Sequence, residues 1–135
     1  MDSALESNKQ TAIAFLKTAF LERNPEEAIR LYVGEYYRQH NPGVPDGKEA
    51  VIAYAKQRAG DNPGRTMNFV RVVAEGDYVV LHIQHIFAET DKAYADAPHG
   101  LASVDIFRFE NGKIVEHWDV LQAVPAKAAH NNTMF

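Results

Sequence analysis

The hydrophobic pattern of the chain changes at Arg65, and this change is the strongest constraint on its fold. Before that point apolar residues recur at helical spacing, as in Ile13, Leu16 and Phe20. After it, apolar and polar residues alternate, which is typical of half-buried β-strands. Helices first and strands afterwards predict an α+β domain: three N-terminal helices packed on a curved antiparallel (mixed) sheet, which closes over them as a cone with an open mouth.

The first part of the chain carries three helix-start signals. Ser3 or Ser7 can cap the first helix, because a serine hydroxyl accepts a hydrogen bond from a free backbone N–H. Asn24 followed by Pro25 predicts the start of a short second helix, with the asparagine as cap and the proline in the first turn. Asp46 is expected to cap the third helix, which a glycine- and proline-rich stretch ends.

Segments 67–75 and 78–88 alternate as strands and are joined by Gly76-Asp77, a two-residue hairpin turn with glycine first. If Glu75 pairs with Tyr78, one face of this hairpin is more apolar than the other and is assigned to the core. That face is predicted to hold Val70, Val72, Ala74, Val79, Leu81, Ile83, His85 and Phe87. His85 is therefore expected to point inward, and His82 outward.

The segment 107–121, FRFENGKIVEHWDVL, reads as a second hairpin with the densest group of ionisable side chains. Asn111-Gly112 is a turn signal, since both residue types tolerate positive φ. His117 and Asp119 are two apart on the second strand and share a face, whereas the intervening Trp118 faces the other way. A histidine beside an aspartate is consistent with an acid/base site or with a solvated strand face.

Two registers are open for this hairpin. With a two-residue Asn111-Gly112 loop, Asp105 lies opposite Trp118 and faces away from Asp119. With a three-residue loop and Gly112 in a left-handed bulge, Asp105 opposes His117 and shares its face. Both faces mix apolar and polar residues, so alternation does not choose between the two registers.

Composition bounds the class of protein. The 135 residues suit one domain, expected over 1–124, followed by a C-terminal tail over 125–135. The net charge of −4 comes without any run of Lys or Arg, so we expect no nucleic-acid partner. The chain has no cysteine, no secretory signal pattern at its start and no stretch apolar enough for a membrane span. We expect a cytoplasmic protein that does not enter a membrane.

Four motifs, together with the order of elements, resemble the SnoaL-like polyketide cyclases of the NTF2-like superfamily. They are Arg38–Pro42, Asp46–Ala50, Val104–Arg108 and Asn111–Asp119, which reads NGKIVEHWD. The resemblance covers almost the whole chain and implies the NTF2-like cone. It also favours the bulged register of the last hairpin. This fold hosts isomerases, dehydratases, hydrolases and non-catalytic proteins, so the fold does not decide the chemistry.

In the cyclases that this chain resembles, an acidic residue on the last hairpin strand is the acid/base in an intramolecular aldol closure, without metal or cofactor. Asp119 stands at that position. Asp105 stands where the archetype carries a histidine, and Asn41 matches an asparagine of the pocket. A second carboxylate beside the first changes how the pair titrates, so Asp105 is a departure that bears on the mechanism.

We therefore hypothesise a cofactor-independent cyclase or isomerase that transfers protons on a small, hydrophobic carbonyl compound. Asp119 is the predicted acid/base, tuned or oriented by His117 and Asp105. Asn41 with His40 is predicted to bind a substrate oxygen. The other reading is a non-catalytic module, in which the same cone holds a small apolar ligand or serves dimerisation.

His85 is a candidate for substrate contact, but it also reads as a hydrogen-bonded core histidine. No metal is expected, and the polar loop that carries Glu89, Asp91, Asp96 and His99 is not predicted to bind one. Motifs for nucleotide phosphates are absent, so no nucleotide cofactor is expected. We expect a homodimer through the outer sheet face, because Ile114, Trp118 and Val120 would otherwise face water.

Overall fold

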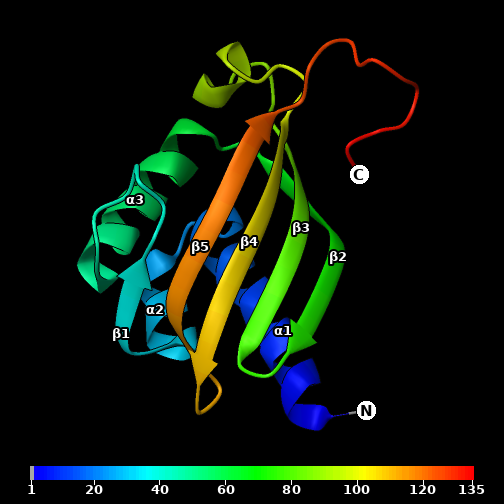
Figure 1. Cartoon of the computed structure of the whole chain (residues 1–135). Coiled ribbons are helices and arrows are strands. Elements are labelled where there is room, and N and C mark those ends of the chain that lie inside the picture. The colour runs from blue at the N-terminus through cyan, green and yellow to red at the C-terminus, as the bar shows by residue number, and fades with distance from the viewer. Residues whose placement is uncertain (1) are drawn as a thin grey trace.

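The computed structural model describes residues 2–135 and contains one five-stranded sheet in the order β1-β5-β4-β3-β2. β1 runs parallel to β5 and all other neighbours are antiparallel, so the sheet is mixed. Three α-helices lie on one face of the curved sheet (Figure 1). The predicted α+β class is confirmed. No helix in residues 2–135 is long and apolar enough to cross a membrane.

The elements follow the order expected from the sequence. The helices are α1 (Ser3–Leu16), continued by a π-helical turn η1 (Lys17–Leu21), then α2 (Pro25–Tyr32) and α3 (Lys48–Asp61). The strands are β1 (Val33–Gln39), β2 (Thr66–Glu75), β3 (Tyr78–Ile86), β4 (Leu101–Glu110) and β5 (Lys113–Ala123). A short 3-10 turn, η2 (Lys92–Ala95), lies in the loop before β4.

Of the predicted helix caps, the structure has the one on α2. The Asn24 side chain accepts a hydrogen bond from the backbone N–H of Glu27. α1 is capped by Asp2 and not by a serine. The prediction for α3 was also wrong: Gly47 is the N-cap, at φ 97°, and Asp46 instead accepts a hydrogen bond from the backbone N–H of Gln39 at 2.7 Å. The aspartate ties the loop to β1.

The β2-β3 hairpin has the predicted pairing of Glu75 with Tyr78, but one inner-face assignment was wrong. The register shifts by one residue between Phe69 and Arg71, so Val70 is an inserted bulge residue and is 36% exposed. Phe69 takes the inner-face position opposite Ile83. A single inserted residue reverses which side chains face inward, and strict alternation cannot reveal it.

The last hairpin has neither of the two predicted registers. Asn111 and Gly112 both have positive φ, at 52° and 78°, and form a two-residue turn with Glu110 paired to Lys113. The inserted residue is Val115, because the pairing shifts between Phe109↔Ile114 and Arg108↔Glu116.

This shifted register places Asp105 directly opposite Asp119, and His117 opposite Phe107. Asp105, His117 and Asp119 therefore share the inner face of the sheet, as the bulged alternative required, although Gly112 is not the bulge. Ile114 turns inward and is fully buried, which corrects its assignment to the outer face.

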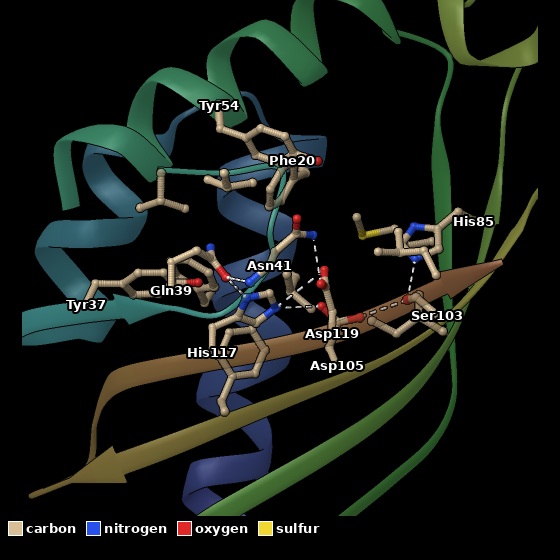
Figure 2. Close-up of a pocket in the computed structure, with 18 of the residues that line it drawn as sticks. Phe20, Tyr37, Gln39, Asn41, Tyr54, His85, Ser103, Asp105, His117 and Asp119 are labelled. Carbon is tan, nitrogen blue, oxygen red and sulfur yellow. Dashed lines mark hydrogen bonds and ion pairs between the residues drawn. The ribbon is translucent and has the colours of Figure 1, made fainter. Parts of the chain in front are cut away.

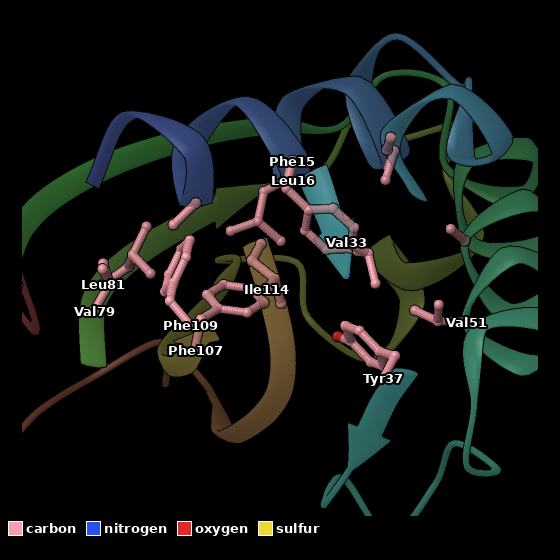
Figure 3. Packing of buried hydrophobic residues seen from close by; sticks show 14 of the residues in the cluster. Phe15, Leu16, Val33, Tyr37, Val51, Val79, Leu81, Phe107, Phe109 and Ile114 are labelled. Carbon is pink, nitrogen blue, oxygen red and sulfur yellow. The ribbon is translucent and has the colours of Figure 1, made fainter. Parts of the chain in front are cut away.

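The apolar core lies between α1 and the inner face of the sheet (Figure 3). Phe15 of α1 meets Phe107 of β4 edge to face, with ring centroids 5.7 Å apart. Leu81 and Phe109 complete this layer, both almost fully buried. Further along the same face polar side chains replace apolar ones, so the core ends at a polar wall.

The C-terminal tail, which follows β5, folds back toward the outer face of the sheet (Figure 1). The Phe135 ring stacks on His82 of β3 with centroids 5.7 Å apart. The backbone carbonyl of Phe135 accepts a hydrogen bond from Arg71 Nη1 at 3.3 Å. The tail is thus docked on its own chain.

Candidate functional site

A cavity lies between the helices and the polar end of the inner sheet face (Figure 2). Its volume is about 50 Å³, which is room for a few water molecules or a small organic group. Apolar side chains such as Phe20, Val51 and Tyr54 form one side. The ionisable groups of β4 and β5, headed by Asp105 and Asp119, form the other. An apolar cavity with a few convergent polar groups is the usual form of a small-molecule site.

His117 stands between the two carboxylates. Its Nε2 atom lies 2.9 Å from Asp105 Oδ2 and 3.9 Å from Asp119 Oδ2. Both contacts follow from the register, because the three residues occupy neighbouring positions on one face of adjacent antiparallel strands. Its closest carboxylate partner is therefore Asp105.

The other nitrogen of the imidazole ring defines its protonation. His117 Nδ1 lies 2.8 Å from Gln39 Oε1, and this oxygen also accepts the backbone N–H groups of His40 and Asn41 at 3.1 and 3.0 Å. Two backbone donors identify the atom as the amide oxygen. Nδ1 must then carry a hydrogen, so the contact between His117 Nε2 and Asp105 Oδ2 is bridged by one shared proton.

A chain of hydrogen bonds with a defined direction holds the other oxygen of Asp105. Arg65 Nη2 can only donate, so its 2.8 Å contact makes His85 Nδ1 an acceptor. His85 Nε2–H then donates to Ser103 Oγ at 2.7 Å, and the Ser103 hydroxyl donates to Asp105 Oδ1 at 2.8 Å. Burial, reinforced by the charge of Arg65, lowers the pKa of His85 to about 3, in agreement with a neutral ring.

Asp119 is the carboxylate with a free oxygen toward the cavity. Its Oδ1 accepts a hydrogen bond from Asn41 Nδ2 at 2.8 Å. Burial raises the pKa of Asp119, opposed by the charge of His117 and reinforced by that of Asp105, while the Asn41 bond lowers it. Burial and the two carboxylates also raise the pKa of Tyr37 well above its usual range, so it remains a neutral phenol. A carboxylate tuned in this way can take a proton from a substrate and return it.

The structure brings five of the six predicted site residues to this cavity and leaves one outside. Asn41, His85, Asp105, His117 and Asp119 all line it. The predicted roles of these residues in catalysis or substrate binding stay predictions, but their convergence is a structural fact.

His40 is the residue that lies apart. Its Nε2 is 2.7 Å from Glu116 Oε2, and its ring stacks on Trp118 at 4.7 Å with an interplanar angle of 5°. Glu116 and Trp118 belong to the outer-face positions of β5, and Glu116 also accepts a bond from Arg108 Nε. Along the chain His40 adjoins Asn41, but successive residues of an extended segment point to opposite sides.

Sequence reasoning missed four residues of the site: Tyr37, Gln39, Arg65 and Ser103. Strand alternation could have found three of them, since Tyr37 and Gln39 precede Asn41 by two-residue steps and Ser103 precedes Asp105 by one such step. Arg65 lies at the end of a loop, where no periodicity indicates the direction of a side chain.

The same cluster has the composition of a metal site. One ligand atom from each of Asp105, His117 and Asp119 lies within 4.8 Å of the others. Ligands at 2.0–2.2 Å around a tetrahedral ion stand about 3.4 Å apart, however, whereas Asp105 Oδ2 and His117 Nε2 are 2.9 Å apart. That distance is a hydrogen bond. Metal binding would require this pair to separate and His117 Nε2 to lose its proton.

Several solved structures are similar to this chain in fold. TsrD from Streptomyces laurentii is 25% identical, with a TM-score of 0.69 and 90% of each chain covered. A protein of Jannaschia sp. CCS1, assigned as a SnoaL-like polyketide cyclase, is 16% identical, with a TM-score of 0.71 and coverage of 90% of this chain and 89% of that one. IdmH from Streptomyces antibioticus, assigned as a polyketide cyclase, is 21% identical, with a TM-score of 0.66 and coverage of 84% and 91%.

These likenesses establish a shared fold. A search of curated protein sequences returned no match. The sequence model of one family, described as the SnoaL-like domain, matches residues 12–117, which include every residue of the polar cluster except Asp119. Because that match spans most of the chain, the protein belongs to the SnoaL-like domain family.

Proposed function

We propose that this protein is an enzyme that transfers a proton at the carbon next to a carbonyl group, in an aldol-type cyclisation or an isomerisation of a small substrate. The observation that carries the proposal is the position of Asp119. This carboxylate has a raised pKa, lines a cavity with one apolar side and lies beside the proton-sharing pair Asp105 and His117. Family membership supports the same class, as do structural neighbours assigned as polyketide cyclases.

Each polar group has a role in this proposal. Asp119 removes the α-proton, and the proton between Asp105 and His117 stabilises the oxygen of the resulting enolate. In a cyclisation the enolate carbon attacks a second carbonyl of the same substrate, and the alkoxide that forms takes the proton back from Asp119. Asn41 keeps Asp119 in place through its amide N–H. The scheme transfers protons and forms one carbon–carbon bond without any change in overall oxidation state, so we expect no cofactor requirement.

The proposal is tested by exchange of α-protons for deuterium in D2O, followed by NMR on small ketones and oxo acids. We expect catalysed exchange whose rate rises with pH and then levels off, because only the ionised Asp119 accepts a proton and its pKa is raised. Binding in the cavity is detected by shifts of the NMR signals of its lining residues. A compound that binds there but exchanges its α-protons no faster than in buffer would favour the non-catalytic binding module.

A homodimer through the outer sheet face remains part of the proposal. Val104 and Val120 are paired across β4 and β5 and are 37% and 70% exposed, so two neighbouring apolar side chains face water. Light scattering is expected to give twice the monomer mass at micromolar concentration, and Val120→Lys is expected to shift the protein toward the monomer. A wild-type protein that is monomeric at this concentration contradicts the dimer.

A further inference from the structure

Arg65 is a cavity residue that the proposed proton transfer does not use. It precedes β2 and lines the cavity together with the carboxylate cluster. Within residues 2–135, the one hydrogen-bond acceptor of its guanidinium is the neutral His85 ring, and its Nε atom is buried without a partner. A guanidinium carries five N–H donors, so most of its capacity to bind an oxygen anion is unused.

No carboxylate of the described chain neutralises this guanidinium by direct contact. Asp105 and Asp91 act on it only through space. The two oxygens of Asp105 are occupied by Ser103 and His117. Those of Asp91 accept the backbone N–H groups of Gly64, in the loop before β2, and of Ala88, in the loop after β3. A buried cation that is not paired is unfavourable, which makes Arg65 a candidate for pairing with a ligand.

The surroundings of Arg65 keep it charged and in place. Its guanidinium lies 5.4 Å from the Phe20 ring centre and 5.6 Å from that of Phe87. Burial, with the charge of Arg58 nearby, lowers the pKa of Arg65 to about 10, so it is still a cation at neutral pH. Because the Asp105–His117 pair shares one proton and is neutral as a pair, the cavity carries this cation against Asp119 alone.

We propose that Arg65 binds the carboxylate of the substrate, and that the substrate is therefore a small oxo acid. This inference rests on the proposed function for the reacting end, where the carbon next to the carbonyl faces Asp119. A cavity of about 50 Å³ admits only a few non-hydrogen atoms, which suits a short oxo acid. The planar guanidinium matches a planar carboxylate by two parallel hydrogen bonds.

If Arg65 did no more than orient His85, acids and neutral compounds of similar size would bind with equal affinity. The affinities of pyruvate, acetoacetate and levulinate are compared by NMR titration with those of the neutral compounds butanone and methyl acetoacetate. We expect at least one of the acids to bind ten-fold or more tightly than both neutral compounds, with a shift of the Arg65 Nε–H signal. Equal affinities for acids and neutral compounds overturn the proposal on the wild-type protein alone.

Variants then assign the effect to this residue. Arg65→Gln is expected to lower the affinity for the preferred acid ten-fold or more and to leave that for butanone unchanged, while Arg65→Lys retains part of the preference. The matched control is Arg30→Gln, an exposed arginine of α2 paired with Glu27, which is expected to have no effect. If Arg65→Gln does not fold, two other measurements decide. Wild-type affinity for the acid in Arg65→Lys, together with no shift of the Arg65 Nε–H signal in the wild-type protein, overturns the assignment.

The proposed reaction and the proposed anion subsite at Arg65 can be contradicted independently of each other. Binding is measured without turnover, and Asp119→Asn is expected to keep the preference for acids. Acids that bind through Arg65 but exchange no α-proton would contradict the proposed reaction and leave the anion subsite standing. Catalysed exchange on acids and neutral ketones alike, with equal affinities, would contradict the subsite and leave the reaction standing.

Discussion

Replacement of Asp119 by asparagine is expected to lower the rate of α-proton exchange by about 10²- to 10⁴-fold, the range that a positioned general base contributes. The amide has the same shape and can still accept the hydrogen bond from Asn41, so the cavity should keep its geometry. It has no basic oxygen and cannot take a proton. The measurement is the exchange rate in D2O for wild type and variant with the same substrate.

The stability of the same variant separates a catalytic carboxylate from a structural one. Burial raises the pKa of Asp119, so the folded protein favours the protonated form more than the unfolded chain does. This carboxylate therefore destabilises the fold increasingly as the pH rises above the pKa of the unfolded chain, up to the folded pKa. Removing its charge is expected to preserve or raise the free energy of unfolding at pH 7.

The control is Asp96→Asn, at an exposed loop position outside the cavity, which is expected to change neither quantity. A pair of results would contradict the role of Asp119: an exchange rate close to wild type, together with a clear loss of stability in urea unfolding. That combination would show a carboxylate retained for structure. Loss of rate without loss of stability is the pattern of a site that trades stability for chemistry.

The layers of the fold were predictable because they depend on local periodicity. Helical spacing before Arg65 and alternation after it correspond to α1 and to the strands β2 to β5. The helix start at Asn24 was readable for the same reason, since a cap and the proline after it act within one turn.

The register of the last hairpin was not predictable because its cause is distant in sequence. The inserted Val115 is buried, and a Cβ atom on Gly34 of β1 would stand only 3.0 Å from its Cγ1. The missing side chain at Gly34 thus makes room for the bulge, through a contact between strands about eighty residues apart. His40 was misplaced for a related reason, since its partners Glu116 and Trp118 lie on a distant strand.

In the candidate site, too, contacts within one strand were predictable and contacts between distant segments were not. His117 and Asp119 could be paired from their two-residue spacing alone. Arg65 could not be placed beside His85, because β2 and β3 bring these residues together only through a register that includes the Val70 bulge. The proximity of two residues on the same strand can be predicted from their spacing in the sequence, whereas the proximity of residues on two strands joined across a bulge cannot.

His85 is expected to make the stability of the protein sensitive to acid. It is almost fully buried, it accepts a hydrogen bond from Arg65, and its pKa is lowered to about 3. In the unfolded chain a histidine titrates near its usual pKa of about 6.5. The stabilisation is therefore complete above about pH 6.5 and is lost as the pH falls toward 3, since the unfolded state binds the proton first.

The size of this effect follows from the two pKa values. Between pH 7 and pH 5 it amounts to about 2 kcal/mol of unfolding free energy, and it grows by about 1.4 kcal/mol for each further pH unit down to the folded pKa. His85→Gln places an amide where its oxygen can accept from Arg65 and its nitrogen can donate to Ser103. The variant keeps these bonds without a titrating ring.

We therefore expect the difference in unfolding free energy between wild type and His85→Gln to shift by about 2 kcal/mol in favour of the variant on going from pH 7 to pH 5, measured by urea unfolding. All other titrating groups are shared and cancel in this difference. The control is His99→Gln, at an exposed histidine in the loop before β4, which is expected to show no such shift in unfolding free energy between pH 7 and pH 5. A pH-independent difference would mean that His85 binds a proton as readily in the folded protein as in the unfolded chain, so that the folded ring would be protonated at pH 5. A protonated ring cannot accept from a guanidinium, so the direction of the hydrogen-bond chain from Arg65 to Asp105 would then be wrong.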